Sequence, residues 1–293
     1  MDYLILGGYG FLGSRIVDYL KDKGNIVIGT SKKKFNNNDH KSIIGYRELN
    51  DMELDQLIKN FDFVFDASGI SGPEIIKSNI ETILNVNSIW PIRLSRSCIK
   101  NNCKLTTFST YHCENIFIND QESLKQQIYP LSKTLAEISI MKLDGWKKNI
   151  NIIRLGNMIG SPGKNFMGNS KLLPLDIARN LVMKGIANVY SNPSKEIGYI
   201  PIFKLFDSDI ISLQGFNKFY SEDKISIFEL SKQIKSCYEE MTGKEGNLIF
   251  KENLSDYQSC SISRDIILEI RSIINYFLKL KNSNKNLKTT LNE

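Results

Sequence analysis

The stretch Gly7-Gly8-Tyr9-Gly10-Phe11-Leu12-Gly13 decides the fold. It follows an apolar run at residues 3–6 that is typical of a buried strand, and it leads into residues 11–21, where apolar residues recur at helical spacing. Glycines at its first, fourth and seventh positions permit a tight turn, close approach of a pyrophosphate and close packing of helix on strand. The helix N-terminus offers unpaired N–H groups to the phosphates. The candidate cofactor-binding residues here are Gly7, Tyr9, Gly10, Phe11, Leu12 and Gly13.

Strand-like and helical patterns alternate through the first half of the chain, which is typical of βαβ units and a parallel sheet. Strands are predicted at residues 3–6, 25–30, 61–67, 104–109 and 151–155. Helices are predicted at residues 11–21, 52–59, 75–100 and 131–148. We expect Pro91 to break the third of these helices. The pattern predicts an α/β fold with a Rossmann-type, doubly wound parallel sheet.

The second half of the chain has a different pattern. Pro, Gly and Asn become frequent after residue 156, and amphipathic helical patterns return at residues 227–241 and 264–280. We therefore expect a cofactor-binding domain over residues 1–156 and a smaller, mostly helical substrate lobe over 157–280, partly interleaved with the first. The polar tail at 281–293 is expected to fray.

The composition is that of a globular protein, with 41% hydrophobic and 24% charged residues among 293. No apolar run approaches the roughly 18 to 20 residues that span a bilayer. The first residues read as an apolar strand, so we expect no signal peptide. We expect a cytoplasmic protein without a membrane partner. The net charge of +6 forms no basic stripe, so no nucleic-acid partner is expected. Five cysteines without Cys-x-x-Cys spacing and two histidines predict no metal site.

The choice of cofactor depends on the end of the second strand. An NAD enzyme usually places an acid there, about 20 residues beyond the glycines, to bind the ribose 2′-hydroxyl. This chain has Thr30, Ser31 and Lys32 instead, which suit a 2′-phosphate, although a solvated loop has the same composition. We expect NADP(H) as the cofactor. Further contacts are expected from the residues that end the third strand, Ala67, Ser68 and Gly69.

Tyr129-x-x-x-Lys133 is a candidate catalytic pair. A spacing of four places both side chains on one helical face. A phenol titrates near 10, and an ammonium nearby favours its ionised form, so Lys133 is expected to lower the pKa of Tyr129. Ser109 and Thr110 follow the strand at 104–109, at the edge where α/β sheets bind ligands.

These motifs occur in the order found in the extended short-chain dehydrogenases/reductases, the NAD-dependent epimerase/dehydratase family, which the chain resembles over about residues 1–215. The matching stretches, besides the glycines and the Tyr/Lys pair, are Asn85-Val86-Asn87, Phe108-Ser109-Thr110, residues 131–137, residues 154–163 and residues 170–174.

The resemblance implies a role for each matched residue. Tyr129 exchanges the proton, Lys133 lowers its pKa and holds the nicotinamide ribose, and Thr110, with Ser109, binds the substrate oxygen. Asn85 holds a proton-relay water or the local helix geometry. Asn157 and Lys171 meet a nucleotide sugar. The helices at 75–100 and 131–148 are expected to pair across a two-fold axis in a homodimer.

Differences between this chain and subclasses of the family reduce the number of reactions to consider. Dehydratases follow the catalytic Thr with Asp-Glu, whereas this chain has Tyr111 and His112. Epimerases that retain NAD fit poorly with a second strand that ends without an acid. Residues 84–89, 108–110 and 197–201 resemble the dTDP-4-dehydrorhamnose reductases, which are 4-ketoreductases. We therefore expect NADPH-dependent reduction of a nucleotide-linked 4-keto-6-deoxy sugar.

Two alternatives stay open. His112 stands where the epimerase/reductases that form GDP-fucose keep an acid/base Cys, and Lys171 lies where they keep the second acid/base. The pair would suit epimerisation next to a keto group, although His112 also suits a polar pocket lining without chemistry. The second alternative is a regulatory protein that binds NADP without catalysis.

Overall fold

The computed structural model describes residues 1–30, 41–114, 124–167, 172–251 and 262–290. Contacts between Cα atoms divide the chain into two compact units. Unit 1 comprises Met1–Leu155, Gly163–Gly168 and Phe206–Phe219, and unit 2 comprises Gly156–Pro162, Asn169–Leu205 and Tyr220–Glu293. The chain therefore leaves the first unit and returns to it twice.

Unit 1 is built on a sheet of seven strands in the order β10-β6-β5-β4-β1-β2-β3, and every neighbouring pair is parallel. The strands are β1 (Asp2–Leu6), β2 (Asn25–Thr30), β3 (Lys41–Ile44), β4 (Phe63–Asp66), β5 (Lys104–Thr110), β6 (Ile150–Leu155) and β10 (Gly215–Phe219). The order reverses between β1 and β4, as in a doubly wound sheet. The predicted α/β, Rossmann-type fold is confirmed, with β3 and β10 as strands that the sequence pattern did not predict.

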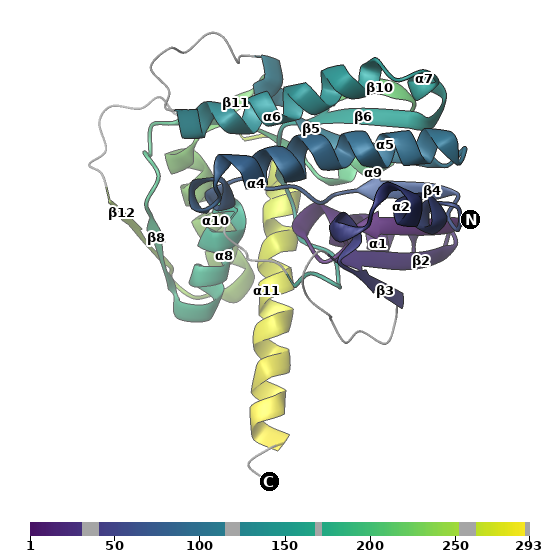
Figure 1. Ribbon diagram of the computed structural model, residues 1–293. Coiled ribbons are helices and arrows are strands. Elements are labelled where there is room, and N and C mark those ends of the chain that lie inside the picture. Colours follow the sequence, from purple (N-terminus) through teal and green to yellow (C-terminus); the bar gives the residue numbers. More distant parts are fainter. Residues whose placement is uncertain (31–40, 115–123, 168–171, 252–261, 291–293) are drawn as a thin grey trace. The chain divides into compact units, whose positions relative to one another are not determined.

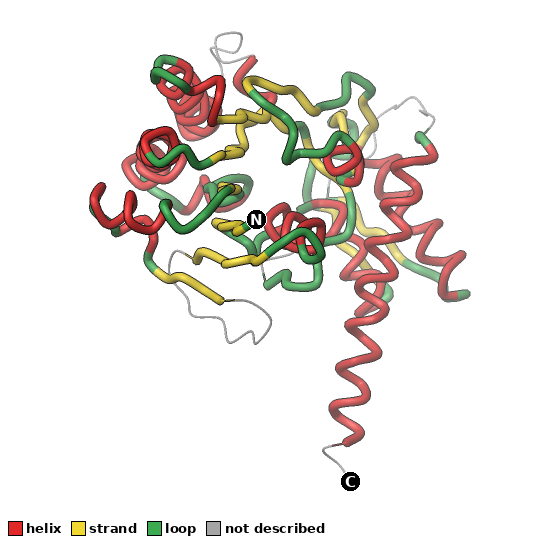
Figure 2. The backbone as a smooth tube through the Cα atoms, turned by 90° about the vertical axis from the view of Figure 1, so that its right-hand side faces the viewer, coloured by secondary structure: helices red, strands yellow, loops and turns green. Residues whose placement is uncertain are grey.

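The helices of unit 1 are α1 (Phe11–Leu20), α2 (Asp51–Ile58), α3 (Pro73–Lys77), α4 (Ile80–Leu84), α5 (Trp90–Lys100), α6 (Leu124–Met141) and α7 (Trp146–Asn149). Three short turns join them: η1 (Tyr46–Glu48), η2 (Asn85–Ile89) and η3 (Tyr111–Glu114). The helices α2, α5 and α6 lie side by side over one face of the sheet (Figures 1 and 2). Their apolar faces close the main core against β1, β4, β5 and β6.

The long helix expected at residues 75–100 is interrupted, but not at Pro91. It breaks at Ser78, and Asn79 caps α4 by accepting a hydrogen bond from the Thr82 N–H (2.7 Å). Between α4 and α5 the backbone widens into a π-helical turn in which the Trp90 N–H bonds to the Asn85 carbonyl. This wider turn carries the chain into α5 at Pro91, which has no N–H to donate. The prediction of a break at Pro91 was wrong.

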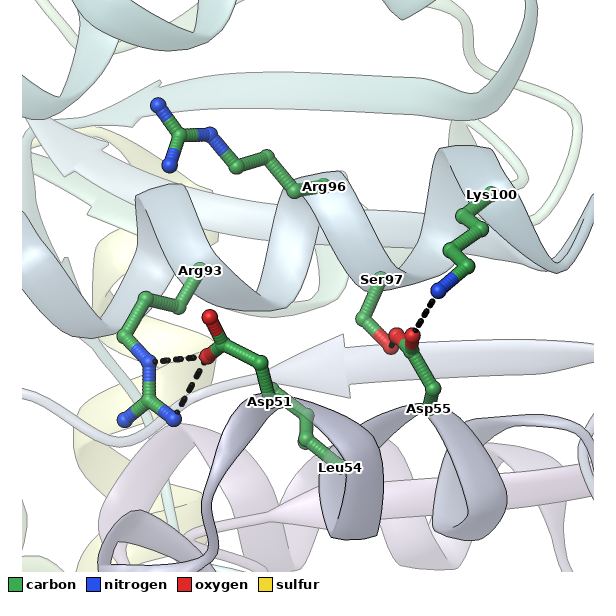
Figure 3. A pocket seen from close by; sticks show the side chains of 7 residues that line it. All are labelled: Asp51, Leu54, Asp55, Arg93, Arg96, Ser97 and Lys100. Carbon is green, nitrogen blue, oxygen red and sulfur yellow. Dashed lines mark hydrogen bonds and ion pairs between the residues drawn. The ribbon is translucent and has the colours of Figure 1, made fainter.

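A row of ion pairs joins α2 to α5 around a surface pocket (Figure 3). Arg93 donates to Asp51 and to the Leu49 carbonyl, and Lys100 donates to Asp55. These pairs are largely exposed, so each contributes little to stability.

Unit 2 contains the helices α8 (Leu173–Lys184), α10 (Ile227–Thr242) and α11 (Arg264–Thr290), which pack on one another. It also contains two small sheets, so it is less helical than expected. One has the order β11-β9-β7 and the other is β12-β8. The strands are β7 (Asn157–Ile159), β8 (Ile186–Val189), β9 (Glu196–Pro201), β11 (Lys224–Ser226) and β12 (Asn247–Phe250). The short helix α9 (Phe203–Asp207) lies where the chain passes between the units.

Two helix ends differ from the prediction. The segment at 131–148 divides at Met141, and α7 starts after Gly145, whose φ is +80°. The helix α11 continues to Thr290, beyond the start of the expected tail at residue 281, and residues 291–293 lie outside the described residues. Among the described residues, none of these helices combines the length and the apolar character needed to cross a membrane.

Candidate active site

The glycine stretch lies at the point where the strand order reverses. It joins β1 to α1, and it faces Ala67, the residue that follows the end of β4. In open α/β sheets this reversal opens a crevice at the carboxyl ends of the strands, and ligands bind there. Gly7 has a φ of +75°, and a Cβ on it would lie 2.8 Å from the Ala67 carbonyl oxygen. A side chain at Gly7 would therefore collide with the backbone after β4, so the close approach of the two loops requires glycine here.

Gly13 gives a test of this cradle. A Cβ there would lie 2.1 Å from the Gly7 carbonyl oxygen, whereas a Cβ on Gly10 would meet the same oxygen at 3.2 Å. We expect Gly13→Ala to push α1 away from the loop and to weaken NAD(P)H binding at least tenfold in a fluorescence titration. Gly10→Ala is the matched control and should weaken binding less. Equal, near-native affinities for both variants would contradict this role of the loop.

The other predicted cofactor residues surround the same loop. Tyr9 is buried, burial raises its pKa, and its carbonyl oxygen accepts the Met167 N–H (3.0 Å). Phe11 and Leu12 are half-buried in the first turn of α1. Thr30 is buried at the end of β2 and donates its hydroxyl to the Ile43 carbonyl (3.4 Å). Ser31 and Lys32 lie outside the described residues.

Tyr129 lies on α6 beside the end of β5. It is half-buried, and its hydroxyl shares a hydrogen bond with Thr110, the last residue of β5. Burial raises the pKa of Tyr129 to about 12, and the bond to Thr110 offsets this only in part. The expected lowering by Lys133 is not what this site shows. Tyr129 therefore carries its proton across the neutral range.

Lys133 lies one helical turn beyond Tyr129 and is inside the site. Its ammonium donates to the Phe108 carbonyl oxygen of β5 (2.9 Å), and burial lowers its pKa. A Cβ on Gly69 would lie 3.3 Å from its Nζ. The loop after β4 and the helix α6 therefore meet at this ammonium.

Asn87 joins this group, and Asn85 does not. The side chain of Asn85 is exposed on the π-helical turn, whereas Asn87 is fully buried. The Asn87 side chain accepts the Ile70 N–H (2.9 Å) and donates to the Ile70 carbonyl (3.0 Å) and to Ser132 (3.3 Å). The placement of Asn85 in the site is corrected in favour of Asn87.

The turn η3 carries further polar residues near the candidate site. The exposed His112 packs its ring 4.1 Å from that of Tyr111, and its centroid lies 6.4 Å from the Tyr129 ring, edge to face. The Ser109 hydroxyl lies 3.6 Å from the Cys113 sulfur rather than beside Tyr129. Thr110 is therefore the hydroxyl of this strand end that reaches Tyr129.

The two predicted sugar-nucleotide residues are not in unit 1. Asn157 belongs to unit 2, where it begins β7 and donates its side-chain amide to the Gly198 carbonyl (3.4 Å). Lys171 lies outside the described residues.

A buried ion pair supports the catalytic helix. Arg154 of β6 makes two hydrogen bonds to Glu137 of α6 (2.9 and 2.6 Å) and a third to Glu114 of η3 (3.2 Å). The Glu137 side chain is 2% exposed, and these carboxylates raise the pKa of Arg154. One guanidinium thus ties together the strand, the helix that bears Tyr129 and Lys133, and the turn that follows Thr110.

Sequence reasoning passed over a further residue of this region, the buried Asp66 at the end of β4. Its carboxylate accepts hydrogen bonds from the N–H (3.2 Å) and the hydroxyl (2.5 Å) of Ser68. The available signal was an acid as the last residue of an otherwise apolar strand, at the edge where ligands bind.

A model of the NAD dependent epimerase/dehydratase family matches residues 3–194, which is more than half of the chain. The chain is a member of this family. The epimerase/dehydratase family match covers both the glycine stretch and the Tyr129–Lys133 pair. A comparison with curated protein sequences finds no match.

Solved structures share the fold. MoeE5 in complex with UDP-glucuronic acid and NAD is 16% identical, with a TM-score of 0.68 over 97% of this chain and 100% of its own. The UDP-N-acetylglucosamine 4-epimerase from Methanobrevibacter ruminantium M1 is 16% identical (TM-score 0.70, 95% and 98% covered). TunA, an NDP-hexosamine 5,6-dehydratase of tunicamycin biosynthesis, is 14% identical (TM-score 0.68, 95% and 98% covered). At these identities the likeness is one of fold alone.

Proposed function

We propose that this family member reduces a keto group on a nucleotide-linked sugar, a 4-keto-6-deoxy sugar in the first instance, with NADPH as the reductant. The observation that carries the proposal is the protonated Tyr129 hydroxyl, hydrogen-bonded to Thr110 at the ligand-binding edge of the sheet. A phenol whose pKa is about 12 is a proton donor at neutral pH and suits the reductive direction.

Four residues of unit 1 have separate roles in the proposed reduction. Thr110 holds the substrate oxygen within reach of Tyr129, which donates its proton as the carbonyl becomes an alcohol. The Lys133 ammonium stabilises the phenolate that remains and is expected to bind the cofactor ribose. Asn87, rather than Asn85, holds the backbone at Ile70 beside Lys133. When bound, the nicotinamide supplies the hydride to the carbonyl carbon.

NADP(H) is the proposed cofactor because β2 ends on Thr30 rather than on an acid. Ser31 and Lys32 follow it in the sequence and are the proposed ligands of the 2′-phosphate, with Ala67, Ser68 and Gly69 beside the pyrophosphate. Near this edge the buried Nε of Arg47 lacks a hydrogen-bond partner among the described residues. Its positive charge further favours NADP(H), which carries a 2′-phosphate besides the pyrophosphate.

Epimerisation is the second candidate. The His112 ring stands edge-on to Tyr129, so a second titratable group lies beside the proton donor. With Lys171, it would exchange the proton on the carbon next to a keto group. The proposed sugar contacts, Asn157 and Lys171, are common to both candidates.

The experiment follows NADPH and NADH oxidation with a panel of nucleotide-linked 4-keto-6-deoxy sugars. Stoichiometric NADPH oxidation, with one alcohol formed per cofactor, supports reduction. Exchange of sugar C–H protons in D₂O without net oxidation would favour the epimerase. Tight NADP(H) binding with neither reaction would identify a regulatory protein instead. A strong preference for NADH would overturn the proposed cofactor.

A homodimer is proposed through α5 and α6. Exposed apolar side chains lie on or beside these helices, namely Ile89, Leu135 and Ile138 (47, 46 and 52% exposed). We expect Leu135→Glu to convert a dimer into a monomer in size-exclusion chromatography with light scattering. A control is Leu268→Glu on α11, which is similarly exposed (51%) and should leave the mass unchanged. A wild-type monomer would contradict the proposal.

The free cysteines support a cytoplasmic location. Cys98, Cys103, Cys113 and Cys237 are buried thiols, which suits a reducing compartment.

A further inference from the structure

Asp66 is a buried carboxylate without an ion-pair partner. Asp66 is 5% exposed, and its carboxylate accepts two hydrogen bonds from Ser68. Within the part of the chain that the structure describes, no Lys or Arg nitrogen lies within 4 Å of it. Burying a charge in this way is costly unless other charges nearby compensate. Burial raises the pKa of Asp66, and the Ser68 hydrogen bonds and the positive charges of Arg47 and Lys133 oppose this.

The loop that Asp66 anchors connects the two halves of the site. On one side, the Ser68 Cα and the Ala67 carbonyl close over Gly7 of the phosphate loop. On the other side, Gly69 abuts the Nζ of Lys133, and Ile70 is bound through both its N–H and its carbonyl by Asn87. Fixing Ser68 therefore fixes the wall against which the ammonium rests.

Lys133 lies among several charged groups, and Asp66 acts on it from beyond ion-pair distance. Asp66 on β4 is the anion that raises the pKa of Lys133 most, against the burial that lowers it. The other groups that face Lys133 are Cys113 on η3 and Glu137 on α6, which also favour its charged form, and Arg47 on η1, which opposes it. Asp66 itself faces Arg47 and Lys133, and the Tyr46 hydroxyl shares a hydrogen bond with Ser68.

We propose that Asp66 is a positioning residue that keeps the Lys133 ammonium charged and in place, and thereby sets the pH range over which Tyr129 transfers its proton. This inference rests on the proposed function only in its second half. The charge on Lys133 is a property of the folded protein that is measurable without turnover. The link from Lys133 to Tyr129 requires the reaction.

The direction of the effect follows from electrostatics. Removing a negative charge near the Lys133 ammonium makes its proton easier to lose. Lys133 therefore loses its charge at lower pH in Asp66→Asn. An uncharged Lys133 no longer stabilises the phenolate that Tyr129 leaves when it gives up its proton, and this is the proposed link to turnover. Asparagine has nearly the same shape and still accepts the Ser68 bonds, so the substitution changes mainly the charge.

The first measurement is the titration of Lys133 by NMR in protein labelled with 13C at the lysine Cε. The Lys133 resonance is assigned by its loss in Lys133→Arg. We expect Asp66→Asn to lower the pH at which Lys133 loses its proton by about half a unit or more. Asp51→Asn removes an equally charged but exposed acid on α2, and should leave the titration unchanged. An unshifted Lys133 in Asp66→Asn would overturn the inference, whatever the protein catalyses.

The second measurement is the pH dependence of kcat for the wild type and Asp66→Asn. The alkaline limb, which reports the loss of charge on Lys133, should move to lower pH, so that ketoreduction falls at least about threefold at alkaline pH relative to the wild type. Superposable profiles, with a shifted Lys133, would overturn the link to Tyr129. Asp66→Ser, also neutral and smaller, gives the same comparison if the amide does not fit. Absence of turnover in the wild type would count against the proposed function, while the NMR result still decides the role of Asp66 at Lys133.

Discussion

Replacing Tyr129 with Phe is expected to lower turnover by roughly 10²- to 10⁴-fold, which is the range that a positioned general acid contributes. The phenyl ring keeps the packing on α6 and loses only the hydroxyl that bonds to Thr110. The substrate oxygen then has no proton donor at that position. The measurement is initial-rate NADPH oxidation at saturating substrate.

Its control separates chemistry from binding. Tyr129→Phe should retain the fold, judged by circular dichroism, and should bind NADPH within about threefold of the wild-type affinity, because the glycine cradle is unchanged. A loss confined to KM, with kcat intact, would contradict the assignment of Tyr129 as proton donor.

Replacing Glu137 with Gln is expected to lower the free energy of unfolding by about 3 kcal/mol. Glu137 is 2% exposed and is held by two hydrogen bonds from Arg154. Removing its charge leaves the Arg154 guanidinium, itself only 16% exposed, with the more exposed Glu114 as its partner. The measurement is equilibrium urea unfolding at neutral pH.

A surface pair provides the comparison. Asp51→Asn breaks the Arg93–Asp51 contact, in which the Asp51 side chain is 82% exposed, and should cost no more than about 1 kcal/mol. Equal losses for the two variants would show that burial does not strengthen the Arg154–Glu137 pair. The difference between them measures what burial contributes.

The fold was predictable where local signals agree with the tertiary structure. Glycine spacing, an apolar strand on one side and a helical period on the other gave β1 and α1 to within a residue. The strand β10 carried no such signal, because Gly-Phe-Asn-Lys-Phe is short and mixed. It becomes a strand by pairing with β6, some 60 residues earlier in the chain. Tertiary pairing of this kind overrides local propensity.

The site was predictable by residue type but not by orientation. The Tyr129–Lys133 spacing correctly placed both residues on α6, beside the end of β5. The choice between Asn85 and Asn87 depended on the phase of a helix that contains a π-helical turn, and sequence periodicity assumes regular phase. The pKa of Tyr129 depends mainly on burial, which raises it and which the spacing of the motif does not reveal. The position of Asp66 near Lys133 could not be predicted from the sequence, because β4 and α6 meet only in the tertiary structure.

The return of the chain to unit 1 at residues 206–219 has a consequence for biosynthesis. On the ribosome, β1 to β6 emerge well before β10, which completes the sheet beside β6. At roughly 5 to 20 residues per second, the intervening 60 or so residues take several seconds to synthesise. During that interval the backbone edge of β6 is exposed and able to pair with another strand. The nascent first unit is therefore a natural client for a chaperone until Phe219 has been added.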